Sequence, residues 1–226
     1  VSSANAESIK KYFDNDKPKL YDAVTCQFAV HYFFKNDETL NNFMFNLKTF
    51  TKPSAYVILT TFDADIIHND VKDGPSTSFY TTKEGDKKII FDVIKKYDGE
   101  VQDITGQTID VHLPVFQDGQ YVPEYLVPTK LLVDKMKENG FTLVDTDMFW
   151  NVFNNHKNFF LNGVQDEEKP AMKSFYMKVK EYYNTNDAMN QACYNFTKKN
   201  RYYVFQKEDS LAIHDKFIKS EPAKYD

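Results

Sequence analysis

The sequence predicts an α/β domain that carries a small inserted antiparallel β-sheet. At roughly 150 residues per domain, 226 residues correspond to one large domain. Strand, helix and strand patterns joined by short links follow one another over residues 19–61, as in the crossover unit of an α/β sheet. From Asp70 to Gln120 the pattern changes to short β-rich runs between glycines and prolines. We therefore expect one domain over 1–208, with the insertion at about 70–120, and a polar tail over 209–226.

Hydrophobic periodicity predicts two helices and two strands in the first part of the chain. Residues 3–13 are expected to form a short helix, and the apolar middle of 19–28 predicts a buried strand. Asp37 is a suitable N-cap for a second helix, because apolar residues follow it at i, i+3, i+4 and i+7. These residues are Leu40, Phe43, Met44 and Leu47. Lys52-Pro53 ends this helix, and residues 56–61 are expected to form the second strand.

The later elements are predicted by β-rich runs and by residues typical of helix ends. Residues 88–94 and 108–116 are expected to be strands of the insertion. A helix is expected over 129–139, with Gly140 at its C′ position, and a strand over 141–149. Pro170 suits the first turn of another helix. The last expected strand is 202–205.

Glycine, arginine and cysteine are scarce, and each shortage excludes a class of site. The seven glycines include no pair separated by a single residue, which excludes the GxGxxG, GxGxG and Walker A loops. Arg201 is the only arginine, so phosphate contacts are expected to fall to lysines and to this residue. Cys26 and Cys193 form no disulfide framework, and no apolar run approaches the ~18 residues of a membrane span. We expect a soluble protein of a reducing intracellular compartment.

Metal and nucleophile chemistry find little support in the sequence. The five histidines are scattered, and neither cysteine has a partner at ligand spacing. Asp63 and Asp65 follow a strand and would suit a hard cation, but such a pair is more often a solvated turn. No serine lies in a strand-turn-helix elbow. We therefore expect no metal and no catalytic nucleophile. The net charge of −5 does not indicate a nucleic-acid binder, although a local groove remains compatible with it.

The most informative segment is 26–33, Cys-Gln-Phe-Ala-Val-His-Tyr-Phe, at the end of the first expected strand. In open α/β sheets, ligands bind at the carboxyl ends of the strands. Gln27 and His31 supply hydrogen-bonding groups there, and Phe28 and Tyr32 supply aromatic faces. The same composition also fits an aromatic core with a satisfied buried histidine, so the residues alone leave both interpretations open.

Four segments, in order, resemble the mRNA cap guanine-N7 methyltransferases. They are Cys-Gln-Phe-Ala-Val-His-Tyr at 26–32, Thr-Thr-Phe-Asp-Ala-Asp at 60–65, Val-Pro-Glu-Tyr-Leu-Val at 122–127, and Phe-Leu-Asn-Gly at 160–163 followed by Pro170. The last resembles the C-terminal methyltransferase domain of poxvirus-type large-subunit capping enzymes. Ala64 stands where this family commonly has glycine. The resemblance covers about residues 2 to 207 and implies the C-terminal portion of a class I, Rossmann-like S-adenosylmethionine-dependent methyltransferase fold.

The resemblance also implies a role for each matched residue. Gln27, Phe28 and Tyr32 match positions that hold S-adenosyl-L-methionine, with Tyr32 at the boundary between cofactor and cap. His31 and Glu124 match contacts to the cap guanosine. The Glu124 carboxylate would accept hydrogen bonds from guanine N1–H and from the 2-amino group. Adenine has neither of these donors.

Two departures from the family pattern concern the last strand and the start of the chain. The family's cap-covering tyrosine, counted back from Phe205, falls on Asn200; we assign it to Tyr202, the nearest tyrosine with the same strand parity. Only about 25 residues precede the Gln-Phe pair. The family's first strand, glycine-containing loop and acidic strand end are therefore expected to lie outside this sequence.

The activity implied by the resemblance is methyl transfer from S-adenosyl-L-methionine to N7 of the mRNA cap guanine. Since N7 carries no proton, no general base is needed. The implied partners are the capped 5′ end of mRNA and upstream triphosphatase and guanylyltransferase domains or a stimulatory subunit, with no membrane. A viral enzyme of this kind would act in a cytoplasmic viral factory or virion. Two alternatives stay open: a non-catalytic cap-binding or stimulatory module of the same fold, and a small-molecule class I methyltransferase.

Overall fold

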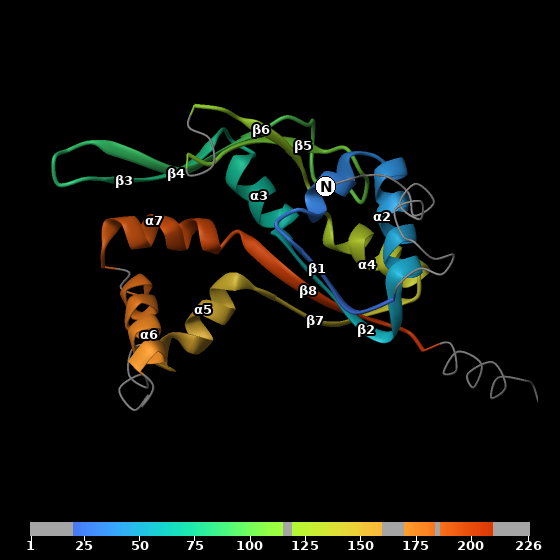
Figure 1. Cartoon of the computed structure of the whole chain (residues 1–226). Helices are drawn as coiled ribbons and strands as arrows, with labels where there is room; N and C mark the ends of the chain where they lie inside the picture. Colours follow the sequence, from blue (N-terminus) through green and yellow to red (C-terminus); the bar gives the residue numbers. More distant parts are fainter. Residues whose placement is uncertain (1–19, 115–118, 160–169, 184–185, 210–226) are drawn as a thin grey trace, which may run out of the picture.

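The central sheet brings together strands from both ends of the chain. A computed structural model describes residues 20–114, 119–159, 170–183 and 186–209. Within them, four strands form a sheet of order β1-β2-β8-β7, in which β1 and β2 are parallel and the other pairs antiparallel (Figure 1). The strands are β1 (Tyr21–Gln27), β2 (Thr51–Phe62), β7 (Phe141–Met148) and β8 (Asn200–Lys207). The expected α/β class is confirmed.

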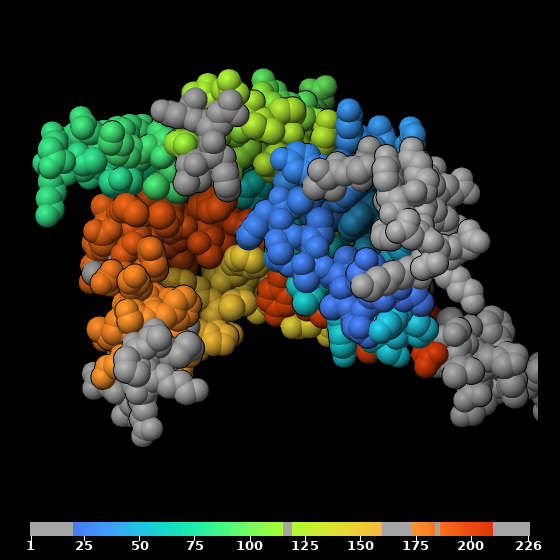
Figure 2. All heavy atoms as spheres, viewed as in Figure 1, coloured from blue at the N-terminus to red at the C-terminus, as the bar shows by residue number. Residues whose placement is uncertain are grey.

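A second, fully antiparallel sheet of order β3-β4-β5-β6 is inserted between the helices α3 (Ala64–Val71) and α4 (Thr129–Glu138). Its strands are β3 (Ser76–Thr81), β4 (Lys87–Lys95), β5 (Thr108–His112) and β6 (Val122–Tyr125). The β3–β4 hairpin extends beyond the rest of the sheet and lies over helix α7 (Ala188–Thr197) (Figures 1 and 2). The expected strands at 88–94 and 108–116 correspond to β4 and β5, whereas β3 and β6 were not expected. The sheet therefore continues to residue 125, beyond the expected end at 120.

The helices lie in two groups around the central sheet. The described helices are the 3-10 helix η1 (Val30–Lys35), α2 (Asp37–Phe50), α3 (Ala64–Val71), α4 (Thr129–Glu138), α5 (Phe149–Asn158), α6 (Pro170–Tyr182) and α7 (Ala188–Thr197). Figure 1 shows α2 and α4 together at one side of the molecule and α5, α6 and α7 at the other. Gly140 follows α4 with φ of 80°, a left-handed conformation that favours glycine, so the expected C′ glycine is confirmed.

Each sheet has its own apolar core. The core of the central sheet includes Phe34, Leu40, Leu59, Phe141 and Tyr203, which lie between β2, β8 and the helices α2 and α4. A second cluster joins α3 to the inserted sheet; its buried members are Ala64, Ile67, Val71, Phe91, Val93, Ile109, Val111 and Leu126. The two cores fix the inserted sheet above the carboxyl end of β1, where the informative segment begins.

Two expectations for the first elements are wrong. Asn36, rather than Asp37, caps α2: its side-chain oxygen accepts a hydrogen bond from the Thr39 N–H at 2.9 Å, and Asp37 is the first helical residue. β1 is not a buried strand, since none of its seven residues is buried. The reason is that, among the described residues, β1 pairs with β2 alone and therefore forms an edge of the sheet.

Other differences follow from weak sequence signals. α3, α5 and α7 were not expected, and α5 and α7 are rich in asparagine, which has low helix propensity. α7 nevertheless has a defined start, because the Asp187 side chain accepts from the Asn190 N–H at 3.0 Å. The expected helix at 3–13, the segment 160–163 and residues 210–226 of the expected tail lie outside the described residues.

Candidate functional site

A cavity of about 420 Å³ opens at the carboxyl end of β1. Its walls come from the β1–η1 junction, from β5 and β6 of the inserted sheet, and from the junction of α7 and β8. The lining residues are Phe28, His31, Tyr32, Thr61, Phe62, Val111, Leu113, Gln120, Val122, Glu124, Phe196 and Asn200. The structure thus brings together four of the residues assigned by resemblance, from segments more than 90 positions apart.

Phe28 projects its ring into the opening because its backbone leaves the strand conformation. Its φ is 50°, in the left-handed region that non-glycine residues seldom adopt. Thr60 of β2 holds this turn: the Phe28 N–H donates to the Thr60 carbonyl oxygen at 3.0 Å and to its hydroxyl oxygen at 2.9 Å. The ring remains 50% exposed and makes an edge contact with Phe149, with ring centroids 5.8 Å apart. A strained backbone here places an aromatic face where a ligand would contact it.

Gln27 lies beside this cavity rather than in its lining. It pairs with Thr60 in the parallel register of β1 and β2 and is exposed at the strand end. Its side-chain amide donates to the Ile58 carbonyl oxygen at 3.5 Å, a long contact. Gln27, Phe28 and Tyr32 are thus all exposed at or just beyond the carboxyl end of β1. An amide and aromatic faces in this place fit the adenosine part of S-adenosylmethionine.

His31 and Glu124 face each other inside the cavity. The distance from His31 Nε2 to the nearer carboxyl oxygen of Glu124 is 3.6 Å, and their side chains are 7% and 12% exposed. Burial lowers the pKa of His31 to about 4 and raises the pKa of Glu124 to about 7. At neutral pH the pair is therefore not a fixed ion pair: an uncharged imidazole faces a carboxyl group near its titration midpoint. A ligand that donates hydrogen bonds would draw Glu124 to its charged form.

Tyr32 adds an accessible aromatic face next to this pair. Its ring centroid lies 4.1 Å from that of His31, with the two rings tilted by 53°, and the side chain remains 43% exposed. Burial, and then the charge of Glu124, raise the pKa of the Tyr32 hydroxyl. The arrangement offers a planar ligand two aromatic surfaces, Tyr32 and Phe28, beside a carboxyl group at the edge.

On the last strand, Asn200 rather than Tyr202 lines the cavity. The Asn200 side chain is 2% exposed, and its amide donates to the Phe196 carbonyl oxygen at 2.9 Å. Its Oδ1 atom has no hydrogen-bond partner among the described residues. The Tyr202 hydroxyl instead donates to Asp145 at 2.9 Å. The literal count from Phe205 would have found Asn200, whereas the choice of a tyrosine led to Tyr202.

Asp63 and the single arginine have a structural role. Asp63 caps α3, since one carboxylate oxygen accepts from the Ile66 N–H at 3.0 Å. The other oxygen accepts from Nε of Arg201 at 2.7 Å. The cation that the sequence assigned to phosphate contacts is therefore engaged by a buried carboxylate, and lysines remain as the cations for phosphate.

Comparison with known proteins identifies a family that spans most of the chain. Residues 2–199 match the family model described as the mRNA (guanine-N(7))-methyltransferase domain. A probable mRNA-capping enzyme of Acanthamoeba polyphaga mimivirus is 32% identical over 222 residues, which is 92% of this chain and 19% of that protein. The mRNA-capping enzyme catalytic subunit of Fowlpox virus is 26% identical over 194 residues, 83% of this chain and 20% of that protein. The chain thus spans about a fifth of the length of these relatives.

Solved structures resemble this chain more loosely. An S-adenosylmethionine-dependent methyltransferase from Clostridium acetobutylicum aligns over 87% of this chain and 62% of its own, with a TM-score of 0.42 and 9% sequence identity.

None of the helices in the described residues is long and apolar enough to cross a membrane.

Proposed function

The chain belongs to the mRNA (guanine-N(7))-methyltransferase domain family, and on that premise we propose that it binds the guanosine cap of mRNA for methylation at N7. The observation that carries the proposal is the position of Glu124, which lies 3.6 Å from His31 in a cavity with aromatic walls. Guanine presents N1–H and a 2-amino group as adjacent donors on one edge. A carboxylate accepts both, so the cavity would select guanine over adenine.

The chain's residues would bind and orient the reacting base rather than move a proton. S-adenosylmethionine supplies a methyl group on a sulfonium, and guanine N7 supplies a lone pair. Glu124 would hold the opposite edge of the base and leave N7 free, while Phe28 and Tyr32 pack on its faces and exclude water. Rate enhancement would then come from holding the two reacting atoms in line. Gln27 and the outer faces of Phe28 and Tyr32 would hold the adenosine side of the cofactor.

The partners follow from the same proposal. The substrate would be the capped 5′ end of mRNA. The viral relatives named as capping enzymes are about five times longer than this chain, which supports triphosphatase and guanylyltransferase domains or a stimulatory subunit as partners. A cytoplasmic viral factory or virion would be the corresponding location.

The decisive experiment is methyl transfer by the complete natural protein with Glu124→Ala. Radiolabelled S-adenosylmethionine and RNA capped with GpppA are the substrates, and RNA capped with ApppA is the specificity control. We expect activity to fall at least about 100-fold, since two hydrogen bonds to a charged group are lost. Glu138→Ala is the matched variant and should keep full activity, because Glu138 is an exposed residue near the end of α4. Undiminished methylation by Glu124→Ala would refute the proposal. Cap binding with no S-adenosylmethionine binding by the complete protein would favour the non-catalytic module.

A second prediction distinguishes the two candidates on the last strand. Asn200→Ala should weaken binding of GpppA about tenfold, because its buried amide lines the cavity. Tyr202→Leu should change this affinity less than twofold, because its hydroxyl contacts Asp145. Titration calorimetry with GpppA measures both affinities, and thermal unfolding verifies that each variant is folded. The reverse order of effects would restore Tyr202 as the cap contact.

A further inference from the structure

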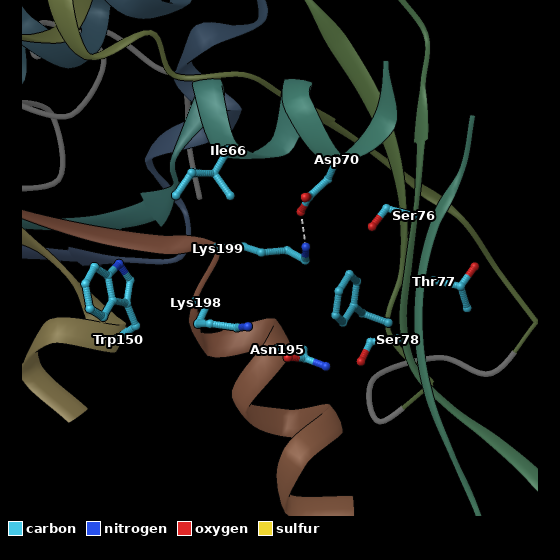
Figure 3. Close-up of a pocket in the computed structure, with 10 residues that line it drawn as sticks. Ile66, Asp70, Ser76, Thr77, Ser78, Trp150, Asn195, Lys198 and Lys199 are labelled. Atoms are coloured by element: carbon cyan, nitrogen blue, oxygen red, sulfur yellow. Dashed lines mark hydrogen bonds and ion pairs between the residues drawn. The ribbon is translucent and has the colours of Figure 1, made fainter. Parts of the chain in front are cut away.

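A second cavity of about 420 Å³ lies between α3, the β3–β4 hairpin, α5 and α7. Figure 3 shows its residues: Trp150 at one end, Lys198 and Asn195 from the α7 side, and the serines of β3 at the other end. Trp150 is 38% exposed, whereas Phe91, which also lines the cavity, is buried. The volume is sufficient for a ligand the size of a nucleotide.

This cavity adjoins the first one, at the carboxyl end of β1, which is called the guanine cavity below because it contains Glu124. Phe196 lines the guanine cavity, and its ring packs against Phe91 of the second cavity, with centroids 5.3 Å apart. Residues that are adjacent in sequence line different cavities: Asn195 and Lys199 line the second cavity, whereas Phe196 and Asn200 line the first. A polymer anchored in the first cavity by its end group therefore passes close to the second.

The charges in the second cavity favour an anion. Lys199 is bonded to Asp70, and these two charges offset each other (Figure 3). Lys198 is exposed, and its Nζ lies 5.3 Å from the centroid of the Tyr194 ring. The ionised groups of the lining are therefore two cations and one anion, which leaves one positive charge. Hydroxyl and amide groups of Ser76 and Asn195 complete a polar side opposite the indole.

We propose that this cavity binds one nucleotide of the RNA chain beyond the first nucleotide after the cap. Its base would stack on Trp150, and its phosphate would lie near Lys198, while Asn195 and Ser76 offer hydrogen bonds to the base edge or ribose. Aromatic stacking accepts any base, so the site would add affinity without sequence preference. The inference rests on the proposed function, since the guanine cavity supplies the anchor.

Trp150 is the only tryptophan of the chain, so its fluorescence reports on this cavity directly. Two probes separate the sites: the dinucleotide GpppA, which ends at the first nucleotide after the cap, and a five-nucleotide RNA that begins with the same cap. The longer RNA should quench Trp150 and bind at least about tenfold more tightly than GpppA. Equal affinity of the two probes, with no additional quenching, would overturn the inference. Failure of GpppA to bind at all would instead contradict the proposed function.

Two variants locate the additional affinity. Trp150→Ala and Lys198→Gln should each weaken binding of the capped pentanucleotide about five- to tenfold and leave GpppA binding within twofold of the unmodified chain. Lys198→Gln should also reduce the slope of log affinity against log salt by about 0.7, the value for one phosphate contact on a single strand. Lys137→Gln, at an exposed residue of α4, is the matched control and should bind both probes normally. Parallel loss of GpppA binding in both variants would show damage to the shared wall and refute a separate nucleotide site.

Discussion

Replacing Glu124 with glutamine is expected to stabilise the unliganded chain at pH 8 and to weaken its binding of a guanine cap. Burial raises the pKa of Glu124 from 4.5 to about 7, so the native state favours the protonated carboxyl. The stability contributed by this group is full below pH 4.5 and is lost as the pH rises through 7. At pH 8 glutamine removes a charge that burial disfavours. A shift of about 2.5 units at 1.36 kcal/mol each sets the gain at up to about 3 kcal/mol.

The same substitution removes an acceptor from the guanine edge and places an amide donor there. We expect affinity for GpppA to fall about 100-fold at pH 8. In the unmodified chain, affinity should also fall below pH 7, by up to about tenfold per pH unit, because guanine requires the carboxylate. Glu124→Gln should show no such pH dependence. Titration calorimetry between pH 6 and 8 measures the affinities, and urea unfolding measures the stabilities. A variant no more stable than the unmodified chain at pH 8 would mean that His31 compensates the charge.

Asp63→Ala is expected to have the largest effect on folding, a loss of about 3 to 5 kcal/mol. Asp63 is 4% exposed and connects three elements: it caps α3, pairs with Arg201 of β8, and donates its backbone N–H to the Lys199 carbonyl oxygen at 2.8 Å. Alanine removes the cap and leaves a guanidinium that is only 25% exposed without its partner. Asp65→Ala is the matched control, since Asp65 is exposed in the first turn of α3, and it should cost less than about 1 kcal/mol. Equal urea-unfolding free energies for the two variants would contradict this role.

The sequence was sufficient to predict elements with strong local patterns. It was insufficient where burial or capping depends on residues that are distant in the chain or on a hydrogen bond. Helix α4 with its glycine, and the strands around 56–61 and 141–148, follow from periodicity and end residues. The exposure of β1 does not, because an apolar strand sequence is the same whether one or two strands flank it. The Asn36 cap was missed because Asp37 is an equally suitable cap residue by type, and the hydrogen bond to Thr39 decides between them.

In the candidate site, too, some features were predicted from the sequence and others depend on tertiary contacts. Resemblance named Phe28, His31, Tyr32 and Glu124, and all four line one cavity. Their protonation states could not be predicted, since the pKa shifts of His31 and Glu124 come from burial where η1 meets β6, a strand that was not expected. Phe196 was missed because it belongs to α7, which has a weak helical sequence, whereas Asn200 was reached by the literal count and passed over in favour of a tyrosine.

The Phe196 ring lines the first cavity and packs against Phe91 of the second, so it would couple binding at the two sites. A nucleotide in the second cavity that fixes this ring would change the affinity of the first for guanine, and guanine would change the affinity of the second by the same factor. The length of an RNA would then be sensed at its first base, with no movement of a domain. Recognition of the cap and of the chain behind it would become one cooperative event rather than two additive ones.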